Sequence, residues 1–206
     1  MPPTSQAEPQ PVGAFWMLQL DAHLPEMPLP SVAAVFERVG PEASVLLAQA
    51  MSLMDAGPLV EGFARGRHCY IAHVAGILAA YGWVSFDEQE IGELGLRLRL
   101  MPGEAYIWDC ATLPAYRGQR LYPALLGWMV RHLQSEGLRR LWIGADSDNV
   151  ASQKGMARAG FQPIADIFLP DDSTTSRPWI RDRPGVPQLV AQDLHQMLPG
   201  LQRSQG

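Results

Sequence analysis

The most informative part of the sequence is residues 113–123, which read LPAYRGQRLYP. The apolar run 105–113 before it is typical of a buried strand, and residues 123–136 after it repeat apolar side chains at helical spacing. A turn from a strand into a helix presents unpaired backbone N–H groups and the positive end of the helix dipole. Arg117 and Arg120 add positive charge. The turn therefore predicts an anion site such as a pyrophosphate site, although it has neither the Gly-Lys-Ser/Thr of a P-loop nor the three glycines of a dinucleotide turn.

The order of elements around this turn predicts a βαβα unit. Asn149 is a good N-cap for the second helix, and Gly137 and Gly160 are placed to end the two helices. The expected elements are a strand at 105–113, a helix at 123–136, a strand at 141–145 and a helix at 150–159. Residues 162–169 are expected to add one more strand.

The N-terminal half is predicted to hold a first strand, two helices and an antiparallel meander. Apolar residues at helical spacing after Ser31 predict the first helix, and Gly57-Pro58 is expected to end the second. Residues 93–100 alternate leucine with polar residues, which is the pattern of a half-buried strand. The expected elements are a strand at 15–20, helices from 31 and at 45–53, and meander strands at 69–74, 76–86, 93–100 and 105–113.

The length and composition indicate one folded domain. The chain has 206 residues, 47% of them hydrophobic, which excludes a disordered chain. Residues 1–12 are rich in proline and are expected to form a flexible arm before a domain at 13–170. Residues 171–206 are expected to form a Pro-rich extension with a short helix at 189–198.

The charge pattern limits the classes of partner. A net charge of −5 without a basic stripe argues against nucleic acid, and no apolar run approaches the length of a membrane span. The amino terminus does not have the pattern of a secretory signal, so a cytoplasmic protein is expected, with Cys69 and Cys110 reduced. Because no Cys or His pair has ligand spacing, no metal is expected.

Two motifs resemble those of the GNAT superfamily of N-acetyltransferases. The family's acetyl-CoA loop, Gln/Arg-x-x-Gly-x-Gly/Ala, falls on Arg117 to Tyr122, and 112–114 is similar to its strand-end segment. The stretch from Asn149 to Gly160-Phe161 is similar to the second motif. The resemblance covers about residues 13–169 and implies an α/β fold, with a mixed, mainly antiparallel central sheet flanked by helices.

The resemblance also implies acetyl-CoA as the acyl donor. In the family, the pantetheine arm lies in a gap between the fourth and fifth strands and the pyrophosphate lies on the loop. Carried over, the backbone of the fourth strand would pair with the pantetheine, the loop would hold the phosphates, and the second motif would also contact the donor. The residues implied are Ala111, Thr112 and Leu113; Arg117, Gly118, Gln119, Arg120, Leu121 and Tyr122; and Asn149 and Ser152.

Two departures from the family pattern concern glycines and an acid. Arg120 and Tyr122 replace the usual glycines of the loop. Met156 stands where many members have a tyrosine that protonates the leaving thiolate, and a thioether has no proton to donate. The acid would then be Tyr122, Cys110 or water, or the CoA thiolate would leave without one.

The base is sought among the carboxylates near the expected thioester. Asp109 is the first candidate, because it interrupts an apolar strand and burial would raise its pKa toward the working range. Glu93 is the second, and the alternative for Asp109 is a purely structural carboxylate.

The resemblance thus predicts an enzyme that moves an acetyl group from acetyl-CoA to a primary amine of a small molecule or peptide, by direct attack in a ternary complex. The alternatives are a catalytically silent acyl-CoA-binding module and an interaction protein that reuses the fold. A monomer or a homodimer is expected.

Overall fold

The computed structural model describes residues 9–20, 23–170, 177–199 and 201–203; part of the N-terminal arm expected at 1–12 therefore lies outside the described residues. The strands are β1 (Gly13–Gln19), β2 (Val35–Val39), β3 (His68–Val74), β4 (Ile77–Ser85), β5 (Glu88–Ile91), β6 (Leu96–Arg99), β7 (Glu104–Thr112), β8 (Arg140–Asp146), β9 (Gln162–Phe168), β10 (Trp179–Asp182) and β11 (Gln202–Arg203). The helices are α1 (Ser44–Ala50), α2 (Gly57–Ala64), α3 (Leu121–Ser135), α4 (Val150–Arg158) and α5 (Gln188–Met197).

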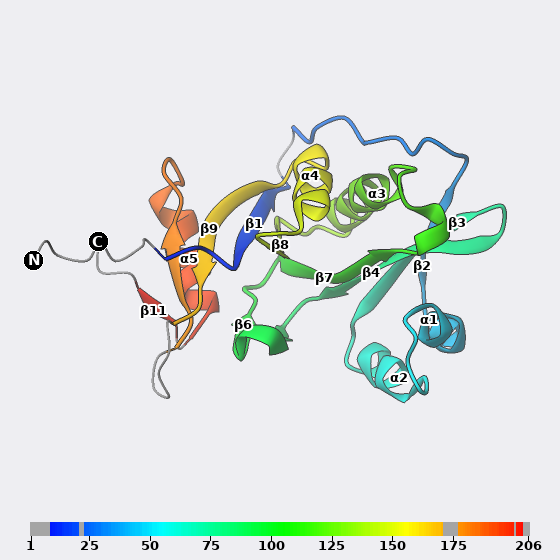
Figure 1. The fold of residues 1–206 in the computed structure, drawn as a ribbon, viewed down its shortest axis with the longest axis horizontal. Coiled ribbons are helices and arrows are strands. Elements are labelled where there is room, and N and C mark those ends of the chain that lie inside the picture. Colours follow the sequence, from blue (N-terminus) through cyan, green and yellow to red (C-terminus); the bar gives the residue numbers. More distant parts are fainter. Residues whose placement is uncertain (1–8, 21–22, 171–176, 200, 204–206) are drawn as a thin grey trace, which may run out of the picture.

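One large sheet has the strand order β11-β10-β9-β1-β8-β7-β4-β3-β2, and β5 and β6 form a separate two-stranded sheet. Neighbouring strands are antiparallel except for β7 with β8 and β10 with β11. Helices α3 and α4 cover one face, while α1, α2 and the β5–β6 hairpin lie on the other (Figure 1). This arrangement confirms the expected mixed α/β fold with a mainly antiparallel sheet.

The parallel pair β7 and β8 separates partway along its length. The two strands pair only from Glu104 with Arg140 to Ile107 with Ile143. Beyond that point β7 continues along β4 as far as Thr112, whereas β8 continues along β1 as far as Asp146. Because each strand is held by its outer neighbour, the sheet opens into a gap between them.

A β-bulge lies in β7 beside this gap. Between the pairs Tyr81 with Ala111 and Trp83 with Trp108, β7 contains one residue more than β4. The extra length is accommodated at Asp109, which has a φ of 44°. Gly82 lies opposite, where a Cβ would be 2.7 Å from Cys110 Sγ. The bulge therefore needs a glycine across from it, and it redirects the end of β7.

Buried hydrophobic clusters lie on both faces of the sheet. Leu125 and Met129 of α3 and Met156 of α4 pack against the inward side chains of β1, β4 and β8. On the other face, β6 and α5 pack against Phe15 and Trp142. Residues Ile180, Leu194 and Met197 are buried in this second cluster, so the segment after residue 177 shares a core with β1 and β8.

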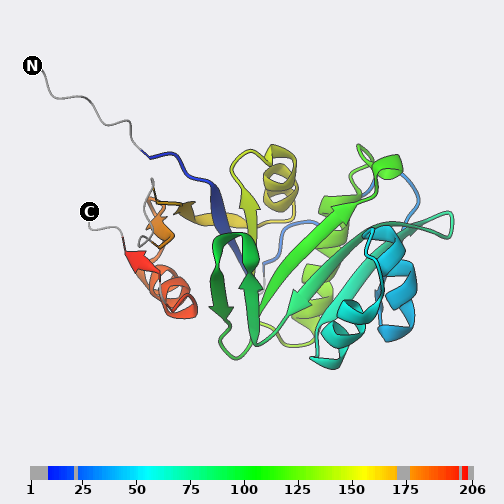
Figure 2. The same ribbon diagram turned by 60° about the horizontal axis from the view of Figure 1, so that its bottom comes forward.

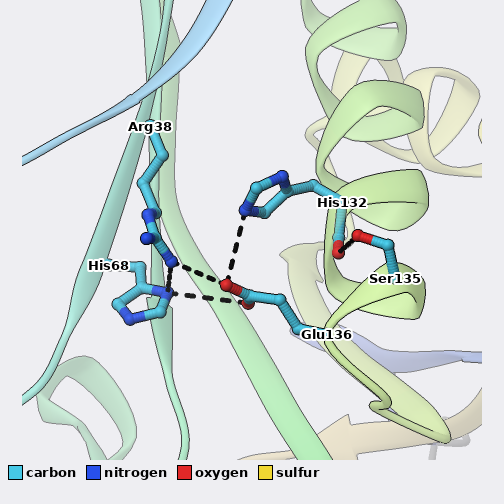
Figure 3. A network of polar contacts seen from close by, with 5 residues as sticks. All are labelled: Arg38, His68, His132, Ser135 and Glu136. Atoms are coloured by element: carbon cyan, nitrogen blue, oxygen red, sulfur yellow. Dashed lines mark hydrogen bonds and ion pairs between the residues drawn. The ribbon is translucent and has the colours of Figure 1, made fainter.

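Glu136, just after α3, joins that helix to β2 and β3 (Figure 3). Its carboxylate accepts a hydrogen bond from Arg38 at 2.7 Å and lies 3.4 Å from His132 and 4.0 Å from His68. Burial lowers the pKa of His68, and the nearby Arg38 guanidinium lowers it further. The two histidines thus lie next to one carboxylate at the end of the helix.

Three of the expected elements are wrong. Residues 35–39 form an edge strand rather than a helix, because pairing with β3 overrides a spacing that suits both structures. Residues 93–100 do not join the main sheet, because β6 pairs with β5, a strand that was not predicted. Gly57-Pro58 begins α2 instead of ending a helix, since proline is favoured in the first helical turn.

The other expected elements are confirmed to within a few residues, including the βαβα unit from β7 to α4 and the helix at 189–198, which is α5. No helix in the part of the chain that the structure describes combines the length and apolarity needed to cross a bilayer.

Candidate functional site

A pocket of about 900 Å³ occupies the gap between β7 and β8. Its lining comes from both faces of the sheet. Tyr122 belongs to α3, Asn149 to the turn before α4 and Ser152 to α4, whereas Gln89 and Leu94 belong to the hairpin side. The separation of the strands therefore creates a passage from one face to the other.

The turn before α3 lies at the end of β7, as predicted. Gly118 and Arg120 both adopt left-handed conformations, with φ of 77° and 57°, and Arg120 is the N-cap of α3. Gln119 accepts a backbone hydrogen bond from Ser31, which fixes the loop. The first N–H groups of a helix have no partner within it, so Leu121 and Tyr122 present donors to an anion.

Arg117 folds back toward the strand. Its Nε donates to the Thr112 carbonyl oxygen at 3.3 Å, and the side chain is exposed. Arg120 is also exposed, and it occupies a backbone conformation that glycine adopts more easily. Both guanidinium groups belong to the loop that precedes the α3 N-terminus.

The end of β7 has one paired edge and one open edge. Ala111 and Thr112 pair with β4, and the Leu113 N–H donates to the Ala79 carbonyl at 2.8 Å. Among the described residues, β8 pairs with none of β7 beyond Ile107. The edge that faces the gap is therefore available to an extended polar chain.

The second motif provides a cap and a hydroxyl. Asn149 Oδ1 accepts from the Ser152 N–H at 3.0 Å, which caps α4 as predicted. Ser152 Oγ lies 3.1 Å from the phenol oxygen of Tyr122. All three residues line the pocket, so this hydrogen-bonded pair faces the gap from the α3–α4 side.

The Tyr122 ring lies against Gly155 of α4. A Cβ at Gly155 would be 2.4 Å from Tyr122 Cδ1, so the close packing of the two helices at this point needs glycine. Burial raises the pKa of Tyr122, and the neighbouring Cys110 raises it further. The phenol therefore keeps its proton at neutral pH.

Cys110 also lines the pocket, and burial raises the pKa of its thiol to about 12. Met156, which the sequence resemblance placed at the position of a tyrosine, is fully buried in the core and does not line the pocket. A side chain on α3, rather than on α4, thus brings a phenol to this site.

The structure describes the side chain of one candidate base, Asp109, but not that of the other, Glu93. Asp109 lines the pocket at the β-bulge, and its side chain is exposed rather than buried as expected. Glu93 lies in a 3-10 turn, Gly92–Leu94, and its side chain is outside the described part of the structure. Gly92 and Leu94 on either side of it line the pocket.

The hairpin side of the pocket was not predicted from the sequence. Gln89 and Ile91 line it, and their contribution depends on the folding of β5–β6 beneath the gap. The alternation in residues 93–100 predicted a strand but not its partner. Among the described residues, no group of three or more His, Cys, Asp or Glu side chains is placed to hold a metal ion.

Comparison with known proteins gives one family match. The model of the acetyltransferase (GNAT) family matches residues 45–161. No curated protein matches the sequence significantly.

Three solved structures have similar folds. A GNAT acetyltransferase from Colwellia psychrerythraea is 18% identical with a TM-score of 0.54, over 76% of this chain and 54% of that one. One from Novosphingobium aromaticivorans is 19% identical with a TM-score of 0.52, over 75% and 61%. The aminoglycoside acetyltransferase meta-AAC0020, from an uncultured soil metagenomic sample, is 14% identical with a TM-score of 0.51, over 70% and 97%. The chain thus spans between half and two thirds of the length of the first two.

Proposed function

Since the chain belongs to the GNAT family of acetyltransferases, we propose that it transfers an acetyl group from acetyl-CoA to a primary amine by direct attack in a ternary complex. The observation that most supports this proposal is the open edge of β7 leading into the pocket, with the N-terminus of α3 at its end. An extended amide chain can pair with the strand while its phosphates meet the helix N-terminus.

The residues around the gap fit the parts of acetyl-CoA. The backbone of Ala111, Thr112 and Leu113 would pair with the pantetheine amides. The N–H groups from Gly118 to Tyr122, including those of Gln119, Arg120 and Leu121, would bind the pyrophosphate. Arg117 would leave the Thr112 carbonyl to reach a phosphate oxygen, exchanging a neutral acceptor for a charged one. Asn149 and Ser152 would border the thioester from α4.

In the proposed reaction, the amine nitrogen attacks the thioester carbonyl carbon, so that a C–N bond forms and the C–S bond breaks. The nitrogen loses a proton to Asp109, directly or through one water, since this carboxylate is exposed to the pocket. Glu93 is the second candidate for that role. The departing thiolate takes a proton from the Tyr122 phenol, which the hydroxyl of Ser152 holds in place at 3.1 Å.

A binding protein that retains acetyl-CoA without turnover is the second candidate. The observation that favours it is Met156, which is fully buried where the family has its tyrosine acid. The two candidates differ in one measurement, which is the release of CoA thiol from acetyl-CoA in the presence of an amine.

Calorimetric titration with acetyl-CoA tests the binding step. Arg117→Glu should weaken the affinity about tenfold, because it removes a charge-assisted contact and adds repulsion to the phosphates. Arg65→Glu is the matched control. It reverses the same charge, but Arg65 lies at the end of α2, on the opposite face of the sheet from α3. Absence of binding to the wild type, or equal losses in the two variants, would argue against the proposed site.

A further inference from the structure

The pocket has a second end, on the face of the sheet opposite α3 and α4. Figure 2 shows the β5–β6 hairpin in front of the main sheet beside β7. The apolar side chains that line this end are only half-buried, although they pack against the cluster around Phe15 and Trp142. They therefore present apolar surface to a ligand that fills the pocket. These lining residues are Val12, Ile91, Leu94 and Trp108.

Hydrogen bonds within the chain satisfy the polar groups of the hairpin wall. The indole N–H of Trp108 donates to Ser85 Oγ at 2.9 Å, and that hydroxyl donates to Gln89 Oε1 at 2.8 Å. The Gln89 amide donates to the carbonyl oxygen of Glu90 at 2.9 Å, and the Glu90 carboxylate lies 2.7 Å from Arg97. The wall is thus preformed, which favours a ligand that fills it without needing hydrogen bonds.

The open edge of β7 leads from α3 toward this end of the pocket. Among the described residues, β8 pairs with none of β7 from Trp108 to Thr112. Cys110 packs with the α3 side of the sheet, whereas Trp108 packs with the hairpin side. A pantetheine arm that follows this edge from α3 would reach the gap with its thioester. The hairpin end is the part of the pocket that lies beyond.

The size and charge of the pocket limit the acyl group that it suits. Its volume of about 900 Å³ lies near the upper end of the usual range for ligand pockets, so it has room for more than a pantetheine arm that ends in acetyl. Of the described residues that line the pocket, none is lysine or arginine. A carboxylate at the end of an acyl chain would lose its hydration there without gaining a cationic partner. An uncharged aliphatic chain would gain from burial at the same place.

From the apolar lining, the satisfied wall and the size of the pocket we infer that its hairpin end binds the acyl chain of the donor, and that the chain is aliphatic, uncharged and longer than acetyl. This inference rests on the proposed function, because it assigns the acyl end of the same donor. The transfer keeps the same balance of atoms. The amine nitrogen bonds to the acyl carbon, the C–S bond breaks, and the proton lost by the nitrogen is balanced by the proton that CoA carries away as its thiol.

Calorimetric titration with acyl-CoA thioesters, in the absence of an acceptor amine, tests the inference by binding alone. The probes are acetyl-CoA, hexanoyl-CoA and adipoyl-CoA, which matches hexanoyl-CoA in chain length but ends in a carboxylate. Burial of one methylene raises the affinity by up to about fourfold, so hexanoyl-CoA should bind at least tenfold more tightly than acetyl-CoA. It should also bind at least tenfold more tightly than adipoyl-CoA. A smaller difference in either comparison would overturn the inference.

Gly92→Phe tests whether the chain lies at the hairpin end, because it fills that end. Gly92 lines the pocket at the start of the 3-10 turn Gly92–Leu94, and a Cβ there would have no atom within 4 Å beyond its chain neighbours. The variant should reduce the preference for hexanoyl-CoA over acetyl-CoA at least tenfold. Ile77→Phe, at a 60% exposed position at the start of β4, is the matched control and should leave the preference unchanged.

Leu169→Glu changes the charge of the pocket wall rather than the volume of the pocket. Leu169 lines the pocket and is 43% exposed, so its replacement removes no core side chain. It should also reduce the preference for hexanoyl-CoA, whereas Ile77→Glu should not. An unchanged preference in both Gly92→Phe and Leu169→Glu would contradict the assignment of the acyl chain to this end.

Turnover is measured separately, as thiol released in the presence of a panel of primary amines. Tighter binding of hexanoyl-CoA that depends on Gly92, without thiol release from any donor, would support the inference while refuting the proposed transfer. Thiol release from acetyl-CoA, together with equal affinities for acetyl-CoA and hexanoyl-CoA, would support acetyl transfer and overturn the inference.

Discussion

Replacement of Gly155 by alanine tests the packing between α3 and α4 that positions Tyr122. The new Cβ would lie 2.4 Å from Tyr122 Cδ1 and 2.6 Å from Cε1, whereas carbon atoms normally approach to about 3.5 Å. The ring would have to move by roughly 1 Å, and its hydroxyl would then leave Ser152 Oγ.

The expected magnitude combines three effects. Overpacking costs about 1–3 kcal/mol, and loss of the Tyr122–Ser152 hydrogen bond costs about 0.5–1.5 kcal/mol. Alanine in place of glycine within a helix returns about 1 kcal/mol. We expect a net loss of about 2 kcal/mol in the free energy of unfolding, or about 4–8 °C in the midpoint of thermal unfolding for a chain of this size.

Two comparisons make the result decisive, and both can be made by urea and thermal denaturation. In a Tyr122→Ala background the clash is absent, so Gly155→Ala should instead stabilise by about 1 kcal/mol. Gly62→Ala in α2 should also stabilise the wild type, because the nearest atoms to its Cβ are 3.6 Å and 3.9 Å away. If Gly155→Ala stabilises the wild type, or destabilises both backgrounds equally, the reasoning is refuted.

Three further outcomes are expected. Tyr122→Phe should lower kcat for acetyl transfer to a primary amine by about 10²-fold or more. Ser152→Ala, which deletes the same hydrogen bond but not the phenol, should lower it less than tenfold, and similar losses in the two variants would argue against Tyr122 as the acid. Cys110, with its pKa raised to about 12, should resist iodoacetamide at pH 8 in the folded protein and react when the protein is unfolded in guanidinium. Alkylation is followed by mass spectrometry, and rapid alkylation of the folded protein would contradict this expectation. Because the folded state lowers the pKa of His68, the free energy of unfolding should fall as the pH falls through the ordinary histidine pKa. His68→Gln should reduce the difference in the free energy of unfolding between pH 5.5 and pH 7.5, as measured by urea denaturation. The same difference in the variant and the wild type would disprove the assignment to His68.

The parts of the fold that sequence reasoning predicted are those whose signals are local. The unit from β7 to α4 carries an apolar strand, an amphipathic helix and the Asn149 cap within about 55 residues, so each element could be located from its own pattern. Residues 35–39 have apolar side chains compatible with a helix or a strand, and only the partner strand β3, about 30 residues later, decides between them.

Only those parts of the candidate site that have a local sequence signal were predicted. The turn before α3 and the cap of α4 were found from neighbouring residues. The exposure of Asp109 depends on a β-bulge where β7 pairs with Gly82 and its neighbours in β4, a strand distant in the sequence. The residues beneath the gap depend on how β5 and β6 fold back. Pairings between distant segments leave little trace in either segment alone.

The early separation of β7 and β8 has a thermodynamic consequence. The unpaired edge of β7 beyond Ile107 leaves amide hydrogens free to exchange with solvent, and a ligand that pairs with this edge acts as an added strand. Binding to the folded form alone raises the free energy of unfolding, by about 2.7 kcal/mol at a ligand concentration 100 times Kd. Slower amide exchange at residues 108–112 and a higher melting temperature would therefore report occupancy of the gap even in a variant that transfers nothing.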